Sequence, residues 1–147
     1  MSHLKLQKVL YYIQSYHLAF FEKKQIFSDQ PEAWVNGPVY RVVYDEFKQY
    51  GVYNPIKFSP EYDEKVNSRY QELKGMLDLT EDQWNYLDSA YNHFAVKSHE
   101  ELVIMTHREL PWNEARKGVG PFDYSNKKIS FDTIYNYYHS ALAKNKK

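Results

Sequence analysis

The sequence contains no cysteine, and this absence excludes three kinds of chemistry. The chain cannot form a disulfide, bind a metal ion through thiolates or attack a substrate with a cysteine nucleophile. Long apolar runs are also missing. The longest strongly apolar runs, such as Leu102 to Met105, are far shorter than the ~20 residues that a membrane-spanning helix needs. Lys5 and Lys8 interrupt the start of the chain, so no signal peptide is visible. We therefore expect a cytoplasmic protein that does not use a membrane.

The chain also lacks an excess of charge of either sign. It has 19 Lys and Arg residues against 19 Asp and Glu residues, which gives a formal net charge of zero. A dedicated nucleic-acid binder carries a basic surface, so the charge balance disfavours DNA or RNA as a partner. Phosphate-binding glycine loops, the HExxH zinc motif and the GxSxG nucleophile motif are absent as well. These absences favour a protein that is not an enzyme and needs no cofactor.

The length and the composition indicate one ordinary folded domain over residues 1–147 with an unusual aromatic content. A chain of 147 residues can bury one hydrophobic core. Its 43% hydrophobic and 26% charged residues are normal for a globular protein, whereas 18% of its residues are aromatic, with Tyr 15 and Phe 8. Tyrosine has an apolar ring and a polar tip. The sequence therefore offers many side chains that suit a core edge or a binding face.

The segment from Leu4 to Phe21 predicts the helix around which the domain is built. Most of its apolar residues, together with His17, fall within an arc of roughly 140° at helical spacing, which is typical of a helix that faces a core. That arc holds Leu6, Val9, Leu10, Ile13, Tyr16, His17, Phe20 and Phe21, and the polar residues Lys5, Gln7, Lys8, Gln14 and Ser15 lie outside it. Ser2 is a suitable N-cap, and we expect the helix to end near Glu22 to Lys24.

A second, narrower apolar strip recurs every seven residues among those polar positions of the same helix. Leu4, Tyr11 and Leu18 form it. Either another helix of the chain covers this strip, or a partner does, with Tyr11 as an aromatic anchor and Lys8 and Ser15 as its polar rim. The sequence leaves both alternatives open.

A turn and a second helix follow. Glu32 to Val35 predicts a brief strand, and Asn36-Gly37 predicts a turn. Pro38 suits the first position of a helix that ends at Gly51.

The rest of the chain predicts further helices and one irregular segment. We expect residues 52–78 to be a surface excursion with one short helix, and Ile56 to Phe58 allow an edge strand. Thr80 and Ser98 each begin a capping box that opens a helix, Pro111 stops the second of these, and Ser130 caps a last one. The expected fold is mainly α: a single compact helical domain around the N-terminal helix, with at most a small β-hairpin or strand pair.

The histidine and tryptophan residues leave several alternatives open. His17 lies in the apolar arc and fits a neutral core histidine, while His107, before a proline-broken helix end, is the better candidate for a general base or, with His99, for a metal ligand. Trp34 and Trp112 each stand beside a turn or a helix break, where they suit either core packing or a binding face.

Three segments together resemble the Panacea, or SocA-like, antitoxin domain. They are LQKVLYY at Leu6 to Tyr12, EAWVNGPV with Tyr44 and Tyr50-Gly51 after it, and THRELPWNEAR at Thr106 to Arg116. The chain departs from the family twice: relatives usually have one more short helix before the first segment, and a second proline often follows GPV where this sequence has Arg41. The matching positions, which we expect to be structural, are Leu6, Gln7, Leu10, Gly37, Pro38, Tyr44, Thr106, His107, Pro111, Trp112 and Arg116.

The resemblance implies a helical antitoxin, in some cases carried by phages, that neutralises a cognate protein toxin by direct binding. It also implies that relatives pair with chemically unrelated toxins, and that some deliver the toxin to an ATP-dependent protease instead. As toxin-binding residues we hypothesise Lys8, Tyr11, Tyr12, Trp34 and Arg41. A small metal-dependent hydrolase and a DNA-associated regulator are the competing hypotheses, and a homo-oligomer is a further possible assembly.

Overall fold

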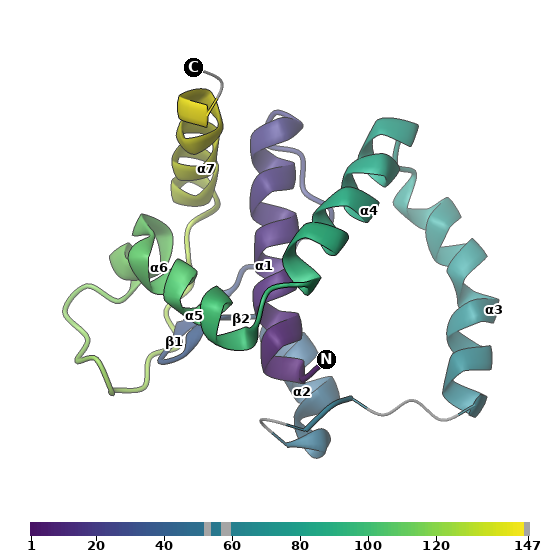
Figure 1. The fold of residues 1–147 in the computed structure, drawn as a ribbon, viewed down its shortest axis with the longest axis horizontal. Helices are drawn as coiled ribbons and strands as arrows, with labels where there is room; N and C mark the ends of the chain where they lie inside the picture. The colour runs from purple at the N-terminus through teal and green to yellow at the C-terminus, as the bar shows by residue number, and fades with distance from the viewer. Residues whose placement is uncertain (52–53, 57–59, 146–147) are drawn as a thin grey trace.

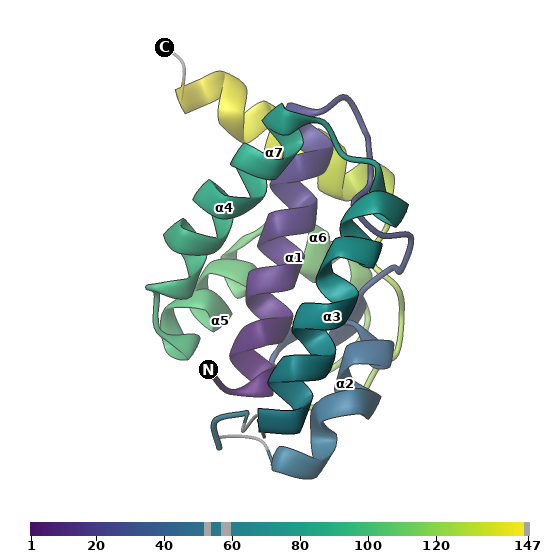
Figure 2. The same ribbon diagram turned by 90° about the vertical axis from the view of Figure 1, so that its right-hand side faces the viewer.

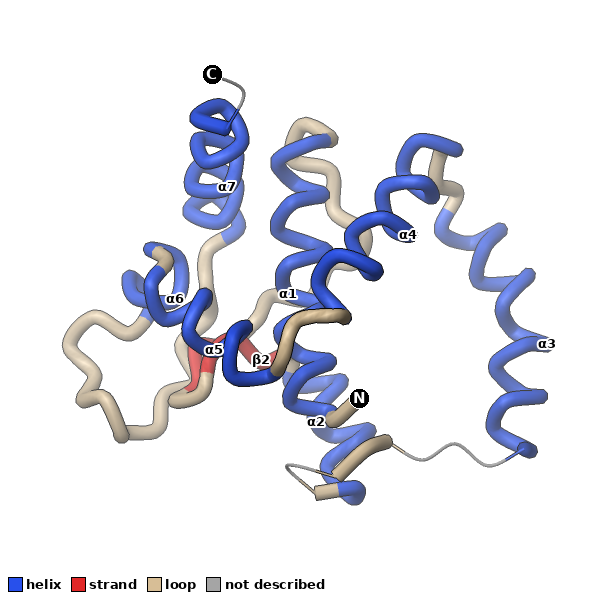
Figure 3. The backbone as a smooth tube through the Cα atoms, in the orientation of Figure 1, coloured by secondary structure: helices blue, strands red, loops and turns tan. Residues whose placement is uncertain are grey.

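Helix α1 (His3–Phe20) runs through the middle of the molecule, and most other elements pack around it (Figures 1 and 2). The computed structural model describes all residues except 52–53, 57–59 and 146–147. In chain order, the other elements are β1 (Glu32–Trp34), β2 (Gly37–Val39), α2 (Arg41–Phe47), the 3-10 helix η1 (Lys48–Tyr50), α3 (Pro60–Leu77), α4 (Glu81–Ala95), α5 (His99–Arg108), α6 (Leu110–Ala115) and α7 (Phe131–Asn145). Helices dominate, and β1 and β2 are the only strands of the described residues (Figure 3). The expected mainly α fold is confirmed.

Local capping sets both ends of α1. The Ser2 hydroxyl accepts a hydrogen bond from the backbone N–H of Lys5 at 3.2 Å, as a helix N-cap does. The helix ends at Phe20, earlier than expected, because Glu22 and Lys23 adopt φ angles of 53° and 69°. A continuing right-handed helix does not permit these angles.

The expected apolar arc of α1 was wrong in both directions, because neighbours surround the helix. Helices α2, α4, α5 and α7 and strand β2 all contact it. Gln7, Lys8, Gln14 and Ser15 were expected outside, but each is at most 1% exposed. Phe20 was expected inside, but it is 52% exposed.

The second strip of α1 is covered from within the chain. Leu4, Tyr11 and Leu18 are 7%, 0% and 1% exposed, and α7 packs along α1 with Tyr138 against Tyr11. Of the two alternatives, the internal cover is therefore the correct one. The hypothesis that Tyr11 anchors a partner on an open strip was wrong.

A short hairpin precedes α2. Strands β1 and β2 pair antiparallel, with Trp34 opposite Gly37 across the turn. Pro38 lies in β2, so its expected place at the start of a helix was wrong. Helix α2 begins later, at Arg41, because Tyr40 keeps an extended backbone and gives its N–H to the side chain of Gln7. Gly51, with a φ of 76°, ends the 3-10 turn that continues α2, at the expected place.

Helix α3 is longer and more isolated than the short helix that was expected in this region. It has 18 residues, and every side chain of it that the structure describes is exposed. It stands apart from α1 in Figure 1. The possible edge strand at Ile56 to Phe58 falls mainly outside the described residues.

Thr80 and Ser98 are the N-caps of α4 and α5, as the sequence predicted. Thr80 forms the full capping box with Gln83 at the start of α4, and the Ser98 hydroxyl accepts from the N–H of Glu101 at the start of α5. Pro111 lies in the first turn of α6. None of the described helices is both long and apolar enough to cross a membrane.

Gly37 provides the first test of this packing. Its φ is 117°, and a Cβ atom there would lie 2.6 Å from Cε of Lys8 and 3.1 Å from Oγ1 of Thr106. We expect Gly37→Val to lower the free energy of unfolding by about 2–4 kcal/mol, because it adds both backbone strain and overpacking. Urea unfolding of the purified protein measures the change.

Gly75, in α3, is the matched control. A Cβ atom at Gly75 meets nothing within 4 Å, so Gly75→Ala should raise stability by roughly 0.5–1 kcal/mol through helix propensity alone. Equal unfolding midpoints for Gly37→Val and the wild type would contradict the close approach of β2 to α1.

Candidate functional site

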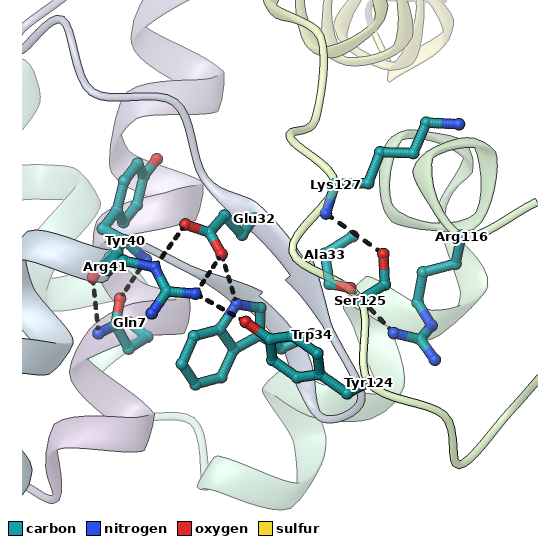
Figure 4. A network of polar contacts seen from close by, with 10 residues as sticks. All are labelled: Gln7, Glu32, Ala33, Trp34, Tyr40, Arg41, Arg116, Tyr124, Ser125 and Lys127. Carbon is teal, nitrogen blue, oxygen red and sulfur yellow. Dashed lines mark hydrogen bonds and ion pairs between the residues drawn. The ribbon is translucent and has the colours of Figure 1, made fainter. Parts of the chain in front are cut away.

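The three resembling segments meet where the hairpin is held against α1. The side-chain amide of Gln7 forms two hydrogen bonds with the backbone of Tyr40: Oε1 accepts from its N–H at 2.7 Å, and Nε2 donates to its carbonyl at 3.3 Å (Figure 4). Both groups are buried. This pair fixes the end of β2 on the first segment.

The third segment holds the hairpin from the other side. Nε1 of Trp112 donates to the carbonyl of Trp34 at 2.8 Å, and Nη1 of Arg116 donates to that of Ala33 at 2.9 Å. Nη2 of Arg116 donates to two more carbonyls, those of Gly120 and Asp123. The guanidinium thus makes three hydrogen bonds to backbone oxygens and ties the hairpin to the loop after α6.

Lys8 lies at the centre of the three segments without a partner of its own. Its side chain is fully buried against Gly37 and Thr106, and its Nζ makes no hydrogen bond to any described residue. Burial lowers the pKa of Lys8 to about 7. A buried amine without a counter-charge destabilises the fold whenever it is protonated.

Three histidines border this lysine. Burial, and then the charge of Lys8, lowers the pKa of His3, His99 and His107. His107 stacks flat on Trp112, with 3.9 Å between the ring centroids and 8° between the planes. Nowhere in the described parts of the chain do three His, Asp or Glu side chains gather as metal ligands. His99 and His107 are therefore not placed together with a third ligand.

His17 is the neutral core histidine that the sequence predicted. It is 0% exposed, and burial is the main cause of its lowered pKa. Its Nδ1 lies 2.7 Å from the carbonyl oxygen of Lys24, and its Nε2 lies 3.2 Å from the amide nitrogen of Gln83. One ring nitrogen thus donates and the other accepts, as in a neutral ring.

A half-buried carboxyl group, that of Glu109, joins α1 to α7. The hydroxyl groups of Tyr12 and Tyr138 donate to Oε1 of Glu109, and that of Tyr138 also lies 3.1 Å from the hydroxyl oxygen of Tyr11. Burial raises the pKa of Glu109. No local pattern signals this cluster, because its members come from α1, from α7 and from the residue between α5 and α6.

Of the five hypothesised toxin-binding residues, three are interior. Lys8, Tyr11 and Tyr12 are each 0% exposed, so they cannot touch a partner in this conformation. Their placement on a contact surface was wrong, because α1 is covered on every side by other elements of the chain.

The other two, Trp34 and Arg41, lie together on the surface beside Tyr124 (Figure 4). Arg41 forms a bidentate ion pair with Glu32, in which Nη2 donates to Oε1 at 2.8 Å and Nε donates to Oε2 at 2.9 Å. Its Nη2 also donates to the hydroxyl oxygen of Tyr124 at 2.7 Å. Its guanidinium also lies over the ring of Trp34, 5.2 Å from the ring centroid. We call Trp34, Arg41 and Tyr124 the hairpin patch. Tyr124 was not foreseen, since it stands in a loop rich in glycine without periodicity.

A family model described as antitoxin SocA-like, Panacea domain, matches residues 6–113. The chain belongs to this family. Searches of curated proteins and of solved structures find no match.

The Panacea segments of this chain build the interior and carry few exposed groups. Gln7, Thr106, Trp112 and Arg116 are at most 8% exposed. Gly37, Pro38 and Pro111 are buried too, while Leu6, Leu10, Tyr44 and His107 are half-buried. Among them, Gln7, Trp112 and Arg116 bond to the hairpin or to the residue that follows it.

The interior position of Tyr11 leads to a test. Tyr11→Asp places a carboxyl group without a partner among Tyr12, Tyr138 and Glu109, so we expect the domain to lose about 3 kcal/mol or more and to melt early. Tyr11→Phe keeps the ring and should cost about 1 kcal/mol. Thermal unfolding followed by circular dichroism separates the two, and an unmoved midpoint for the aspartate variant would contradict the burial of this side chain.

The lowered pKa of Lys8 predicts that the stability of the fold depends on pH. Because the pKa of Lys8 falls from 10.5 in the unfolded chain to about 7 in the fold, the unfolded state binds the extra proton between these values, and stability rises with pH across that window. Lys8→Met should raise the free energy of unfolding at pH 7 by about 2–4 kcal/mol. It should also flatten the rise between pH 7 and about 9.5, below the range where tyrosine ionises.

Urea unfolding at several pH values measures this slope. His3, His99 and His107 titrate at lower pH, because their pKa values lie below 6.5. The expectation fails if both proteins keep the same slope between pH 7 and 9.5.

Proposed function

We propose that this chain is an antitoxin that neutralises a cognate protein toxin by binding it directly in the cytoplasm. Membership of the SocA-like antitoxin family carries this proposal. The polar groups of Gln7 and Arg116 are buried and bond to the chain itself, as does the half-buried carboxyl group of Glu109. A partner must therefore use surface side chains.

We assign a toxin contact to the hairpin patch. Tryptophan, tyrosine and arginine are the residue types that most often dominate binding energy at protein interfaces. Tyr124 is 64% exposed, and the bonds of Arg41 to Glu32 and Tyr124 hold the patch in one shape. A surface that is already ordered loses less entropy on binding.

Co-expression tests the proposal. The gene next to this one, when it encodes a protein that stops growth, supplies the toxin. Wild-type antitoxin should restore growth and form a complex with the purified toxin on size-exclusion chromatography. A constant toxin level during rescue indicates direct neutralisation, whereas a level that falls only in cells with active ATP-dependent proteases indicates delivery for degradation.

A variant pair tests the hairpin patch. Tyr124→Ala should weaken toxin affinity about tenfold or more, which corresponds to about 1.4 kcal/mol. Phe122→Ala is the control, because Phe122 is 89% exposed in the same loop and lies outside the patch. Calorimetric titration measures both. If the wild type neither restores growth nor binds the toxin, the proposed function is refuted. If the two variants bind the toxin with equal affinity, the hairpin patch is not a toxin contact.

A further inference from the structure

A second surface is hollowed and apolar. Helices α4 and α7 pack on either side of the second half of α1 (Figure 1), and a groove of about 440 Å³ remains between them. Its main apolar lining is Tyr16, Phe20, Tyr86, Phe94, Met105 and Leu142. Aromatic residues and methionine are enriched at protein interfaces relative to other surfaces. The groove therefore has the composition of a docking site.

The floor of this groove is rigid. Phe94 stacks on Tyr16 and on Tyr12, with ring centroids 5.8 and 4.9 Å apart. The hydroxyl of Tyr86 donates to the carbonyl of Ile13 at 2.6 Å, so its polar end is satisfied inside the protein and its ring remains as an apolar wall. Phe20, at 52% exposure, stands at the edge.

The mouth of the groove is basic. His93 and Lys97 belong to its lining together with Ser89, and none of the described residues that line it is Asp or Glu. A partner that places a carboxylate here gains a charge interaction, and a partner that places a lysine here is repelled.

We propose that this groove binds an amphipathic helix of the toxin that carries acidic residues beside its apolar face. The inference rests on the proposed function and names the binding surface. The helical part of the groove's α4 wall, Tyr86 to Ala95, is about 13.5 Å long at 1.5 Å per residue, and so accommodates about two and a half turns of a partner helix. Apolar side chains at positions i, i+3 or i+4, and i+7 of that helix fill the groove, and a carboxylate meets Lys97.

A second copy of this chain fits the groove less well. Its most exposed amphipathic helix is α3, whose apolar edge is formed by Val66, Tyr70 and Leu73. At 100° per residue Arg69 and Lys74 flank that edge. Docking of α3 would place these two cations near Lys97 and His93, although α3 also carries Glu61, Glu64 and Glu72. A helix that turns only carboxylates toward Lys97 matches the charge of the groove better.

Two variants of the full chain test the groove with the purified toxin described above. Ser89→Trp fills the groove from an exposed position of α4, and Lys97→Glu reverses the charge at its mouth. We expect each to weaken toxin affinity at least tenfold in calorimetric titration. The loss for Lys97→Glu should shrink at high salt, because screening weakens the lost attraction.

Matched controls are Asn92→Trp, on the exposed face of α4 outside the groove lining, and Lys117→Glu, after α6. Both should bind toxin within twofold of the wild type, and thermal midpoints of all four variants should stay near that of the wild type, since the altered side chains are exposed or half-exposed. Hydrogen exchange of the complex should show added protection in α4 between Tyr86 and Lys97.

The outcomes separate the groove from the proposed function. If both groove variants bind the toxin as tightly as the wild type does, the groove is not the binding site, and the antitoxin function stands. Complete failure of the wild type to bind refutes the function and the groove together. Self-association of the chain that Ser89→Trp abolishes, in light scattering without toxin, would show a second copy as the occupant and would also overturn the inference.

Discussion

Two glutamine side chains, about two turns apart on α1, tie the irregular parts of the chain to the central helix. Gln7 bonds to both backbone groups of Tyr40, and Gln14 bonds to the N–H of Ile26 and the carbonyl of Phe27. Each amide satisfies one donor and one acceptor of a segment that has no regular partner there. A buried polar group left unsatisfied costs about 1–3 kcal/mol, so the hairpin and the segment before it are positioned by these amides as much as by apolar contact.

This arrangement explains which parts of the fold the sequence could predict. The caps at Ser2 and Thr80 involve groups three residues apart, so a local pattern identifies them. The start of α2 depends on Gln7, 33 residues away, and no local pattern reports that contact. The two glutamines were expected on the solvent side because polar side chains usually lie there. Gln7 and Gln14 lie inside instead, because their amides form hydrogen bonds with backbone groups.

The candidate site shows the same division. Trp34 and Arg41 were hypothesised as interface residues, and Arg41 is exposed while Trp34 is half-buried beside it. Tyr11 and Tyr12 have the same suitable chemistry, yet α7 and α5 enclose them. Residue type alone does not distinguish an interface aromatic from a core aromatic, since both bury a ring and use a polar tip. Only the tertiary arrangement, which brings Tyr138 and Glu109 against α1, decides between them.

The Panacea segments lie mainly in the interior, and this leaves other surface positions of the domain free to vary. Gln7, Trp112 and Arg116 bond to the chain itself and are buried, so a partner does not reach them in this conformation. The groove and the hairpin patch also include Phe20, Leu142 and Tyr124, which lie outside those segments, although Trp34 of the patch lies within one of them. Substitution at such exposed positions usually changes stability by less than 0.5 kcal/mol or so. A scaffold held together internally can therefore acquire a new contact surface without losing its fold.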